Sequence, residues 1–168
     1  MPINLELKVR LRNPDEVLNK IKDINAEFKG ELNQTDVYYK KQNGILKLRL
    51  ENGTQTLIKY VRNEKSGERW SDYNLISLEK NDAREYLKDI LEEEIVVEKQ
   101  RLLYLYDNTR IHLDTVNRLG SFLELETLVI NGKDDAGRRF ENVVELLSLD
   151  KENELRKSYR DLMMEQGI

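Results

Sequence analysis

The feature that most constrains this chain is a strict alternation of apolar and polar residues near its start. In the segment NLELKVRL, residues 4–11, every second side chain is aliphatic. Such alternation is typical of a β-strand with one apolar and one polar face. Later segments repeat the pattern, and the charged residues that share a strand face are Lys47 and Arg49, Lys99 and Arg101, and Glu124 and Glu126. Such strands either turn their charged faces to solvent or curl into a barrel with a polar interior.

A solvent-facing ladder of ion pairs is the ordinary explanation for any one of these strands, and each pair would contribute less than about 1 kcal/mol. The pattern of charged faces recurs over five strands, and the opposite faces of these strands are almost entirely aliphatic. This recurrence favours the enclosed arrangement instead. Desolvating this many charges costs on the order of several kcal/mol per ion, so a protein retains them for a ligand rather than for stability. We therefore predict an α+β fold in which charged strand faces line a barrel and helices pack on its apolar outside.

Length and composition narrow the class of protein. The 168 residues fit a single domain over 1–168. The 28 basic and 32 acidic residues leave a net charge of −4, which argues against a protein that binds mainly the nucleic-acid backbone. Cysteine is absent, which excludes disulfides and thiolate metal sites. We expect a cytoplasmic protein with no membrane partner, because no signal-peptide pattern and no membrane-length apolar run occurs.

Turn signals divide much of the chain into short strands. Asn43-Gly44 and Asn52-Gly53 are tight hairpin turns of the Asn-Gly type, and 63–68 is a looser hairpin loop. The expected strands are 3–11, 27–41, 45–51, 55–62, 69–78, 95–106, 109–114 and 122–130.

Helical periodicity marks four further segments. The first begins at Pro14, because proline is favoured at the first helical position, and it ends near Asp23. The second segment begins at Asp82, and the side chains on its inner face are Ala83, Tyr86, Leu87 and Ile90. The third and fourth segments span 134–147 and 152–165. The acidic run at 92–94, which ends the second segment, is expected to be solvated.

The inward strand faces supply the groups that a triphosphate needs. Cations neutralise its charge, carboxylates hold a divalent metal ion, and the site positions the attacking group. The predicted cations are Lys8, Arg10, Lys47, Arg49, Lys59, Lys99, Arg101 and Arg110. The predicted carboxylates are Glu6, Asp114, Glu124 and Glu126. Because a plain anion pocket would not need acids, the mixture favours a metal–phosphate site.

Two single residues leave alternatives open. His112, the only histidine, could be a general base, could position water, or could be an ordinary strand residue at a sheet edge, and we favour the edge. Trp70 could flank a nucleobase, although a single tryptophan is weak support for that role.

The chain resembles the CYTH proteins, or triphosphate tunnel metalloenzymes, along essentially its whole length. The matching motifs, in chain order, are Glu6-Leu7-Lys8, Gln34-Thr35-Asp36 with Tyr38-Tyr39, Leu46-Lys47-Leu48-Arg49, Lys59, Lys99-Gln100-Arg101, Asp114 with Leu119-Gly120-Ser121-Phe122-Leu123-Glu124-Leu125-Glu126, and Ser158-Tyr159-Arg160-Asp161-Leu162. The sequence is most similar to members described as class IV adenylate cyclases. The family also includes thiamine triphosphatases and inorganic triphosphatases.

This resemblance implies an antiparallel barrel of about eight strands that holds a triphosphate and Mg²⁺ or Mn²⁺. It implies a catalytic centre made of Glu6, Lys8, Asp114 and Glu124. The implied metal ligands are Glu6, Glu124 and Glu126, and the cations named above would contact phosphates.

Two departures from the family pattern bear on activity. Asn4 stands where the motif has its first glutamate. An amide oxygen can ligate a hard cation but brings no charge, so we expect weaker binding at one metal position. The His-Phe pair that precedes the motif in the best-defined cyclases is missing here, which counts against cyclisation.

Our leading hypothesis is a metal-dependent enzyme that hydrolyses a triphosphate or cyclises ATP, with ATP, tripolyphosphate and thiamine triphosphate as candidate ligands. The alternative is a non-catalytic module that binds polyphosphate or nucleotide, which Asn4 supports. Net acidity and the lack of a stacking aromatic pair disfavour an RNA-binding sheet. The sequence leaves the natural substrate, the number of metal ions and the oligomeric state open, and a homodimer is among the options.

Overall fold

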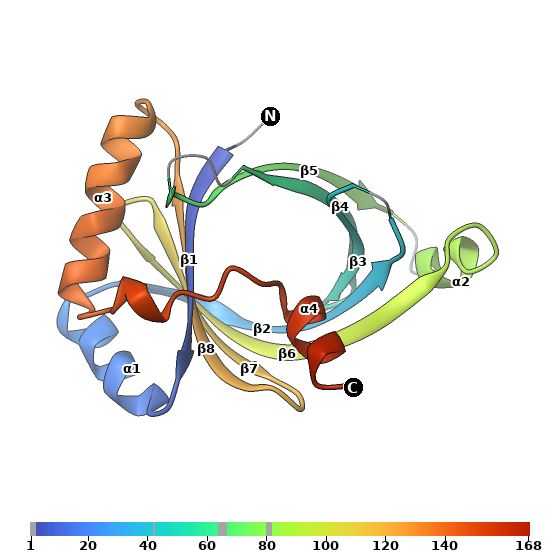
Figure 1. The fold of residues 1–168 in the computed structure, drawn as a ribbon, viewed down its shortest axis with the longest axis horizontal. Helices are drawn as coiled ribbons and strands as arrows, with labels where there is room; N and C mark the ends of the chain where they lie inside the picture. The colour runs from blue at the N-terminus through green and yellow to red at the C-terminus, as the bar shows by residue number, and fades with distance from the viewer. Residues whose placement is uncertain (1–2, 42, 64–66, 80–81) are drawn as a thin grey trace.

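A computed structural model describes residues 3–41, 43–63, 67–79 and 82–168 (Figure 1); part of the predicted loop 63–68 therefore lies outside the described residues. The strands are β1 (Ile3–Leu11), β2 (Glu27–Tyr39), β3 (Ile45–Glu51), β4 (Thr54–Asn63), β5 (Trp70–Leu78), β6 (Glu93–Tyr106), β7 (Thr109–Val116) and β8 (Gly120–Leu128). The helices are α1 (Pro14–Asp23), α2 (Ala83–Leu87), α3 (Lys133–Leu146) and α4 (Tyr159–Glu165), and η2 (Lys151–Asn153) is a 3-10 turn. Among the described residues, no helix combines the length and the apolar composition needed to cross a membrane.

The eight strands close into one antiparallel barrel. Their order is β1-β5-β4-β3-β2-β6-β7-β8, and β8 pairs with β1 to complete the ring. In Figure 1, β5 runs along the upper side of the ring, β2 and β6 run along the lower side, and α1 and α3 lie beside β1. The predicted α+β barrel of antiparallel strands with outer helices is confirmed.

The apolar strand faces lie outside the barrel, beneath the helices. Leu5, Leu7 and Val9 of β1 are at most 5% exposed, and they form one cluster with Ile21 of α1 and Val143 of α3. A second outer cluster joins β2 and β3 to α2. Burying one such aliphatic side chain contributes about 1.5–3 kcal/mol. Much of the hydrophobic stabilisation therefore comes from the layer between the barrel and its helices, which frees the interior for charged groups.

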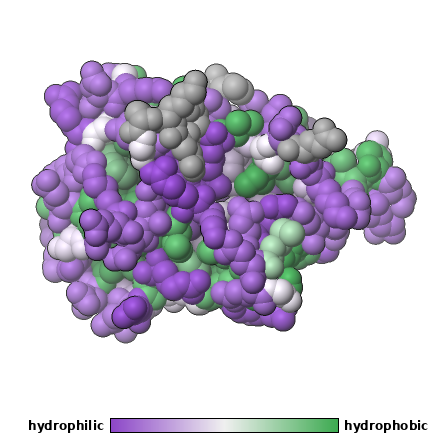
Figure 2. Space-filling view, in the orientation of Figure 1, coloured by the Kyte–Doolittle hydropathy of each residue, from purple (hydrophilic) through white to green (hydrophobic). Residues whose placement is uncertain are grey.

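The helix α4 covers one end of the barrel. Its side chains Tyr159, Leu162 and Met163 form a buried cluster with inward-facing residues at that end, among them Phe122 and Val116. The rings of Tyr159 and Phe122 meet edge-on, with centroids 5.0 Å apart. Figure 1 shows α4 and the chain before it in front of the ring, and Figure 2 shows the same face covered mostly by hydrophilic residues. Among the described residues, α4 and the chain before it cover this end of the barrel, which we call the closed end.

The prediction of one helix over 152–165 is wrong. The chain makes the turn η2 and then runs without helical structure until α4 begins. This stretch is held by β1, because the Leu155 N–H donates to the Lys8 carbonyl at 2.7 Å. Ser158 and Asp161 form a capping box, which satisfies free backbone donors and begins the helix at that point.

The helix α2 also differs from its prediction. It ends after a single turn, with Ala83 buried and Leu87 packed against the outer cluster of β2 and β3. A helix this short presents one face to the barrel. Tyr86 is 72% exposed and Ile90, which lies beyond the helix, is 62% exposed, so the inward placement of these two residues is wrong.

The acidic run at 92–94 is not simply solvated, contrary to the prediction. Glu93 accepts two hydrogen bonds from Arg84, at 2.7 and 2.8 Å. Glu94 pairs with Arg160 of α4. The second contact ties the covering helix to β6.

Candidate functional site

The barrel interior encloses a cavity of ≈ 360 Å³. The predicted site residues that line it are Glu6, Lys8, Lys47, Arg49, Lys99, Arg101, Arg110, Glu124 and Glu126. The structure thus brings together side chains from five strands that are far apart in the sequence. The predicted enclosure of the charged strand faces is confirmed, whereas the role of each residue toward a ligand stays a prediction.

The predicted inward position of Lys59 is wrong. Lys59 is exposed and lies between Ile58 and Tyr60, which both line the cavity. Because successive side chains of a strand point to opposite faces, Lys59 points outward. The cation of β4 that lines the cavity is Arg62, which was not among the predicted cations.

Arg10 is also absent from the cavity wall, although it follows Lys8 on the same strand face. It lies at the closed end, where its guanidinium donates to the Leu119 carbonyl at 2.6 Å and lies 4.7 Å from the centre of the Phe122 ring. Arg10 lies on the solvent side of this ring, because Arg10 is exposed whereas Phe122 is fully buried. Its predicted place among the lining cations is therefore wrong.

A buried carboxylate organises the cations on one side of the cavity. Asp36 of β2 accepts hydrogen bonds from Lys47 at 2.7 Å and from Lys99 at 3.1 Å. Arg49 binds both Asp36 oxygens, at 2.7 and 2.8 Å. Burial alone would raise the pKa of Asp36, but these cations hold it well below its usual range. We call Lys47, Arg49 and Lys99 the cation array. In the sequence, Asp36 is marked only by its place in a motif.

Asp114 is a second buried carboxylate. Arg101 donates to it through two nitrogens, each at 2.7 Å, and the Tyr159 hydroxyl donates at 2.6 Å. Burial would raise the pKa of Asp114, but Arg101 lowers it to about 2. Asp114 lies behind the side chains that line the cavity. Asp114 therefore positions Arg101 and anchors α4, and its predicted catalytic role stays a prediction.

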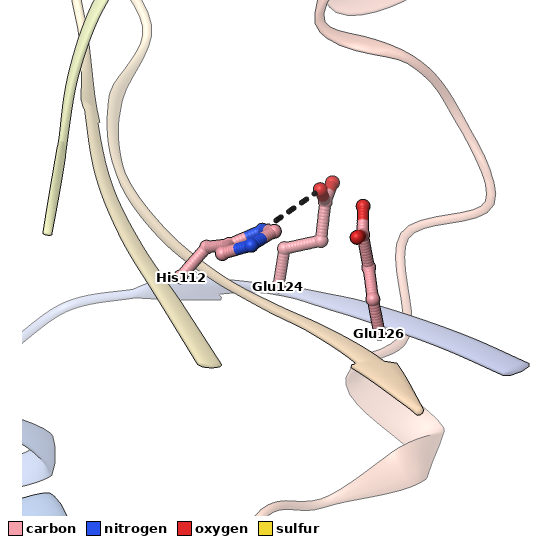
Figure 3. Close-up of side chains that lie close together, drawn as sticks. All are labelled: His112, Glu124 and Glu126. Atoms are coloured by element: carbon pink, nitrogen blue, oxygen red, sulfur yellow. Dashed lines mark hydrogen bonds and ion pairs between the residues drawn. The ribbon is translucent and has the colours of Figure 1, made fainter. Parts of the chain in front are cut away.

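Three potential metal ligands converge on the wall formed by β7 and β8 (Figure 3). His112, Glu124 and Glu126 each offer a ligand atom, and these atoms lie within 4.8 Å of one another. We call them the acidic wall. His112 is 3% exposed, and a closed barrel has no strand edge, so the edge position favoured from the sequence is wrong.

Glu124 connects the acidic wall to the cations. Its carboxylate lies 3.2 Å from Lys8, 3.3 Å from Arg101 and 3.4 Å from Nδ1 of His112. Burial would raise the pKa of Glu124, but Lys8, the hydrogen bond with His112 and Arg101 hold it well below its usual range. Glu124 is therefore ionised at neutral pH, as a metal ligand has to be.

Glu6 lies outside the group that forms the acidic wall. Its Oε2 is 3.6 Å from Nε of both Arg62 and Arg69. Burial raises the pKa of Glu6, and Glu126 adds to the effect. Arg69 is 2% exposed, and its Nε and Nη2 have no hydrogen-bond partner. Arg69 begins the predicted strand 69–78, but no second cation shares its face of that strand, so the alternation did not single it out. The predicted metal role of Glu6 stays a prediction.

The cation array and the acidic wall face each other. In a closed ring of eight, each strand faces the strand four places along, so β3 faces β8. Lys47 and Arg49 of β3 therefore lie across the cavity from Glu124 and Glu126 of β8. A polyanion between these walls would meet cations on one side and a metal-binding group on the other.

The residues present fit a hard divalent cation. Carboxylates suit Mg²⁺ and Mn²⁺, and an imidazole is compatible with transition metals. Asn4 also lines the cavity; it is 2% exposed, and its Oδ1 has no hydrogen-bond partner. A buried carbonyl oxygen without a donor is costly, so a cation near Asn4 would satisfy it.

Trp70 does not reach the cavity. It is 7% exposed and belongs to the outer cluster beneath α1 and α3, where Nζ of Lys133 lies 4.7 Å from the ring centre. The suggested contact with a nucleobase is wrong.

Fold and site together define a barrel whose enclosed, cation-lined interior suits a polyanion. The chain belongs to the CYTH domain family, which it matches over residues 2–159. It is 27% identical over 174 residues to "Putative adenylate cyclase MJ0240" of Methanocaldococcus jannaschii, a match that covers 95% of this chain and 98% of that protein.

Two solved structures have the same fold. The PH1012 protein of Pyrococcus horikoshii matches with a TM-score of 0.84 at 24% identity, covering 95% of this chain and 98% of that one. The protein HpAC1 of Hippeastrum is described as a "putative adenylyl cyclase" with a dominant triphosphatase activity. It matches with a TM-score of 0.68 at 11% identity, covering 99% and 96% of the two chains.

Proposed function

We propose that this protein is an enzyme that hydrolyses a phosphoanhydride bond of a triphosphate inside the barrel, with Mg²⁺ or Mn²⁺. The observation that carries the proposal is the cation array facing the acidic wall across one cavity. Family membership supports a triphosphate ligand, because relatives are named for adenylate cyclase and triphosphatase activity.

The chain's own residues would neutralise and orient the ligand. Arginine can bind phosphate oxygens through two nitrogens, whereas lysine acts as a point charge. Asp36 and Asp114 hold these cations in place before a ligand arrives, so little reorganisation is needed in the transition state. His112, Glu124 and Glu126 would hold the metal ion, which when bound offsets phosphate charge and polarises an oxygen.

Cyclisation of ATP is the second candidate, favoured by the name of the Methanocaldococcus relative. Assays with ATP, tripolyphosphate and thiamine triphosphate, each with Mg²⁺ and with Mn²⁺, separate the reactions. Orthophosphate release would support hydrolysis, and cyclic AMP as the sole nucleotide product would support cyclisation. Tight binding of tripolyphosphate in calorimetry without turnover in either metal would identify the non-catalytic module instead.

Arg49→Ala should weaken binding of tripolyphosphate by about ten- to a hundredfold, the range expected for losing a charge-assisted contact. Metal affinity should not change, because the carboxylate that Arg49 contacts is Asp36 and not a member of the acidic wall. Calorimetric titration with tripolyphosphate and, separately, with Mn²⁺ measures both constants.

Lys59→Ala is the matched control, since it removes a cation from the outer face of the adjacent strand. It should leave the affinity for tripolyphosphate unchanged. Equal losses in the two variants would contradict the assignment of strand faces.

Affinity for tripolyphosphate should fall as the pH rises from 7 to 9. Burial lowers the pKa of Lys99 to about 8, with Asp36 opposing the effect and Arg49 and Arg101 adding to it. Lys99 is therefore mostly charged at pH 7 and mostly neutral at pH 9. Lys99→Met keeps the size of the side chain without the charge. The ratio of wild-type to variant affinity should shrink toward one across this range, and a constant ratio would contradict the assignment.

A further inference from the structure

The helical segment 82–91, on the outside of the barrel, carries the most exposed large apolar side chain among the described residues. Tyr86 is 72% exposed and Ile90 is 62% exposed. The helical hydrogen bonds of α2 continue beyond its last residue, because the Leu91 N–H donates to the Leu87 carbonyl at 2.8 Å. Side chains four residues apart on a helical backbone are neighbours. Tyr86 and Ile90 therefore form an apolar pair that the fold leaves open to water.

The other side of this segment is fixed to the barrel. Leu87 and Leu91 pack against the outer cluster of β2 and β3. The Ala83 N–H donates to the Gln55 side chain at 3.0 Å. Figure 1 shows α2 outside the ring and apart from the other helices. The apolar pair is thus held in place on a projecting element, so a partner that bound it would lose little affinity to conformational ordering.

The same part of the chain accounts for the formal net charge. Of the 32 acidic and 28 basic residues, six acidic and two basic residues lie in 82–94, which leaves 26 of each in the rest of the chain. Asp82 and Asp89 are exposed, and neither forms an ion pair with another described residue. Glu85 and Glu92 pair only with exposed lysines, and such pairs contribute little. Figure 2 shows hydrophobic residues among hydrophilic ones at this end of the molecule.

The negative charge restricts the partners that this surface can bind. It repels nucleic-acid phosphates and anionic lipid headgroups. A second copy of the chain would present the same acidic segment, and the remainder of the chain has no excess of basic residues. The complementary surface is one on which lysines or arginines surround an apolar groove. Tyrosine is enriched in protein interfaces, where it is often among the residues that contribute most to affinity.

We propose that Asp82, Tyr86, Asp89 and Ile90 form a docking face for a different protein, one with an apolar groove bounded by basic residues. Tyr86 and Ile90 would enter the groove, and the two aspartates would face its cations. None of these four residues lines the cavity. The inference is therefore independent of the proposed function.

The first part of the test captures the partner. The photo-crosslinking residue p-benzoylphenylalanine replaces Tyr86 in the full chain, which is expressed in cells of the source organism. We expect an adduct with one other protein. The same residue in place of Arg138, an exposed position of α3, should not give this adduct.

The second part measures the affinity of the purified partner by calorimetry at low and at high salt. Tyr86→Ser and Ile90→Ser should each raise the dissociation constant at least about tenfold, the loss typical of a central interface residue. Asp89→Asn should weaken the dependence of affinity on salt. Ile76→Ser is the matched control, because Ile76 is also 62% exposed but lies on β5, and its dissociation constant should equal that of the wild type. Circular dichroism checks that all four variants fold.

Three outcomes would overturn the docking face. The first is a crosslinking yield at position 86 that is no higher than at position 138. The second is a crosslink between two copies of this chain. The third is a captured protein that binds the wild type, Tyr86→Ser and Ile90→Ser with the same affinity. Each of these outcomes would leave the proposed function intact.

Discussion

Replacing Glu124 with glutamine should lower metal-dependent kcat/KM by at least about a hundredfold, as expected when a preorganised charge is removed from a site. Glu124 is the carboxylate shared by the acidic wall and the cations Lys8 and Arg101. Glutamine has the same size but no charge, so the wall loses one of its two carboxylates. Steady-state rates with Mg²⁺ and Mn²⁺, together with calorimetric affinity for Mn²⁺, measure the effect.

The barrel should remain folded in this variant, because the large hydrophobic cluster beneath α1 and α3 lies outside the barrel, and circular dichroism checks this. Glu145→Gln, at an exposed position of α3, is the control and should retain full activity. A Glu124→Gln protein with the wild-type rate would refute the metal-ligand assignment.

Asp36→Asn should reduce the free energy of unfolding by about 3–5 kcal/mol, the usual cost of leaving buried charges without their partner. Asp36 is fully buried and is the shared carboxylate of the cation array. Without its charge, Lys47, Arg49 and Lys99 repel one another in a poorly hydrated space. Urea denaturation followed by circular dichroism measures the loss.

Tripolyphosphate should stabilise Asp36→Asn more than it stabilises the wild type, because the ligand would supply the missing negative charge. Asp89→Asn, at an exposed position, should match the wild type with and without the ligand. If tripolyphosphate stabilised the variant and the wild type equally, the cation array would not be the polyanion site.

The strand pattern alone predicted the barrel and most of its lining, because alternation is a local property. The prediction for Lys59 was wrong because Lys59 was placed on an inward strand face without counting the strand pairing from the neighbouring turn. The Asn52-Gly53 turn pairs Arg49 with Thr56, and paired residues share a face. Counting from that turn would have placed Arg62 inside and Lys59 outside.

Other errors arose from contacts between distant segments. The stretch before α4 is held by a backbone hydrogen bond between Leu155 and β1, and Glu94 pairs with Arg160, which lies 66 residues further along the chain. His112 was assigned to an edge because the sequence does not reveal which strand pair completes a ring. Asp36 carried a motif signal but no second acid on its strand face, so its role in holding three cations required the structure.

The closed end formed by α4 has a consequence for the order in which products depart. Tyr159 and Phe122 pack at that end, and among the described residues the cavity is covered at Lys99, whose side chain is 2% exposed, and more open at Arg110, whose side chain is 35% exposed. Orthophosphate cut from the innermost position would remain behind the larger fragment until that fragment leaves. Product release would therefore be sequential, and orthophosphate would be the last product to dissociate.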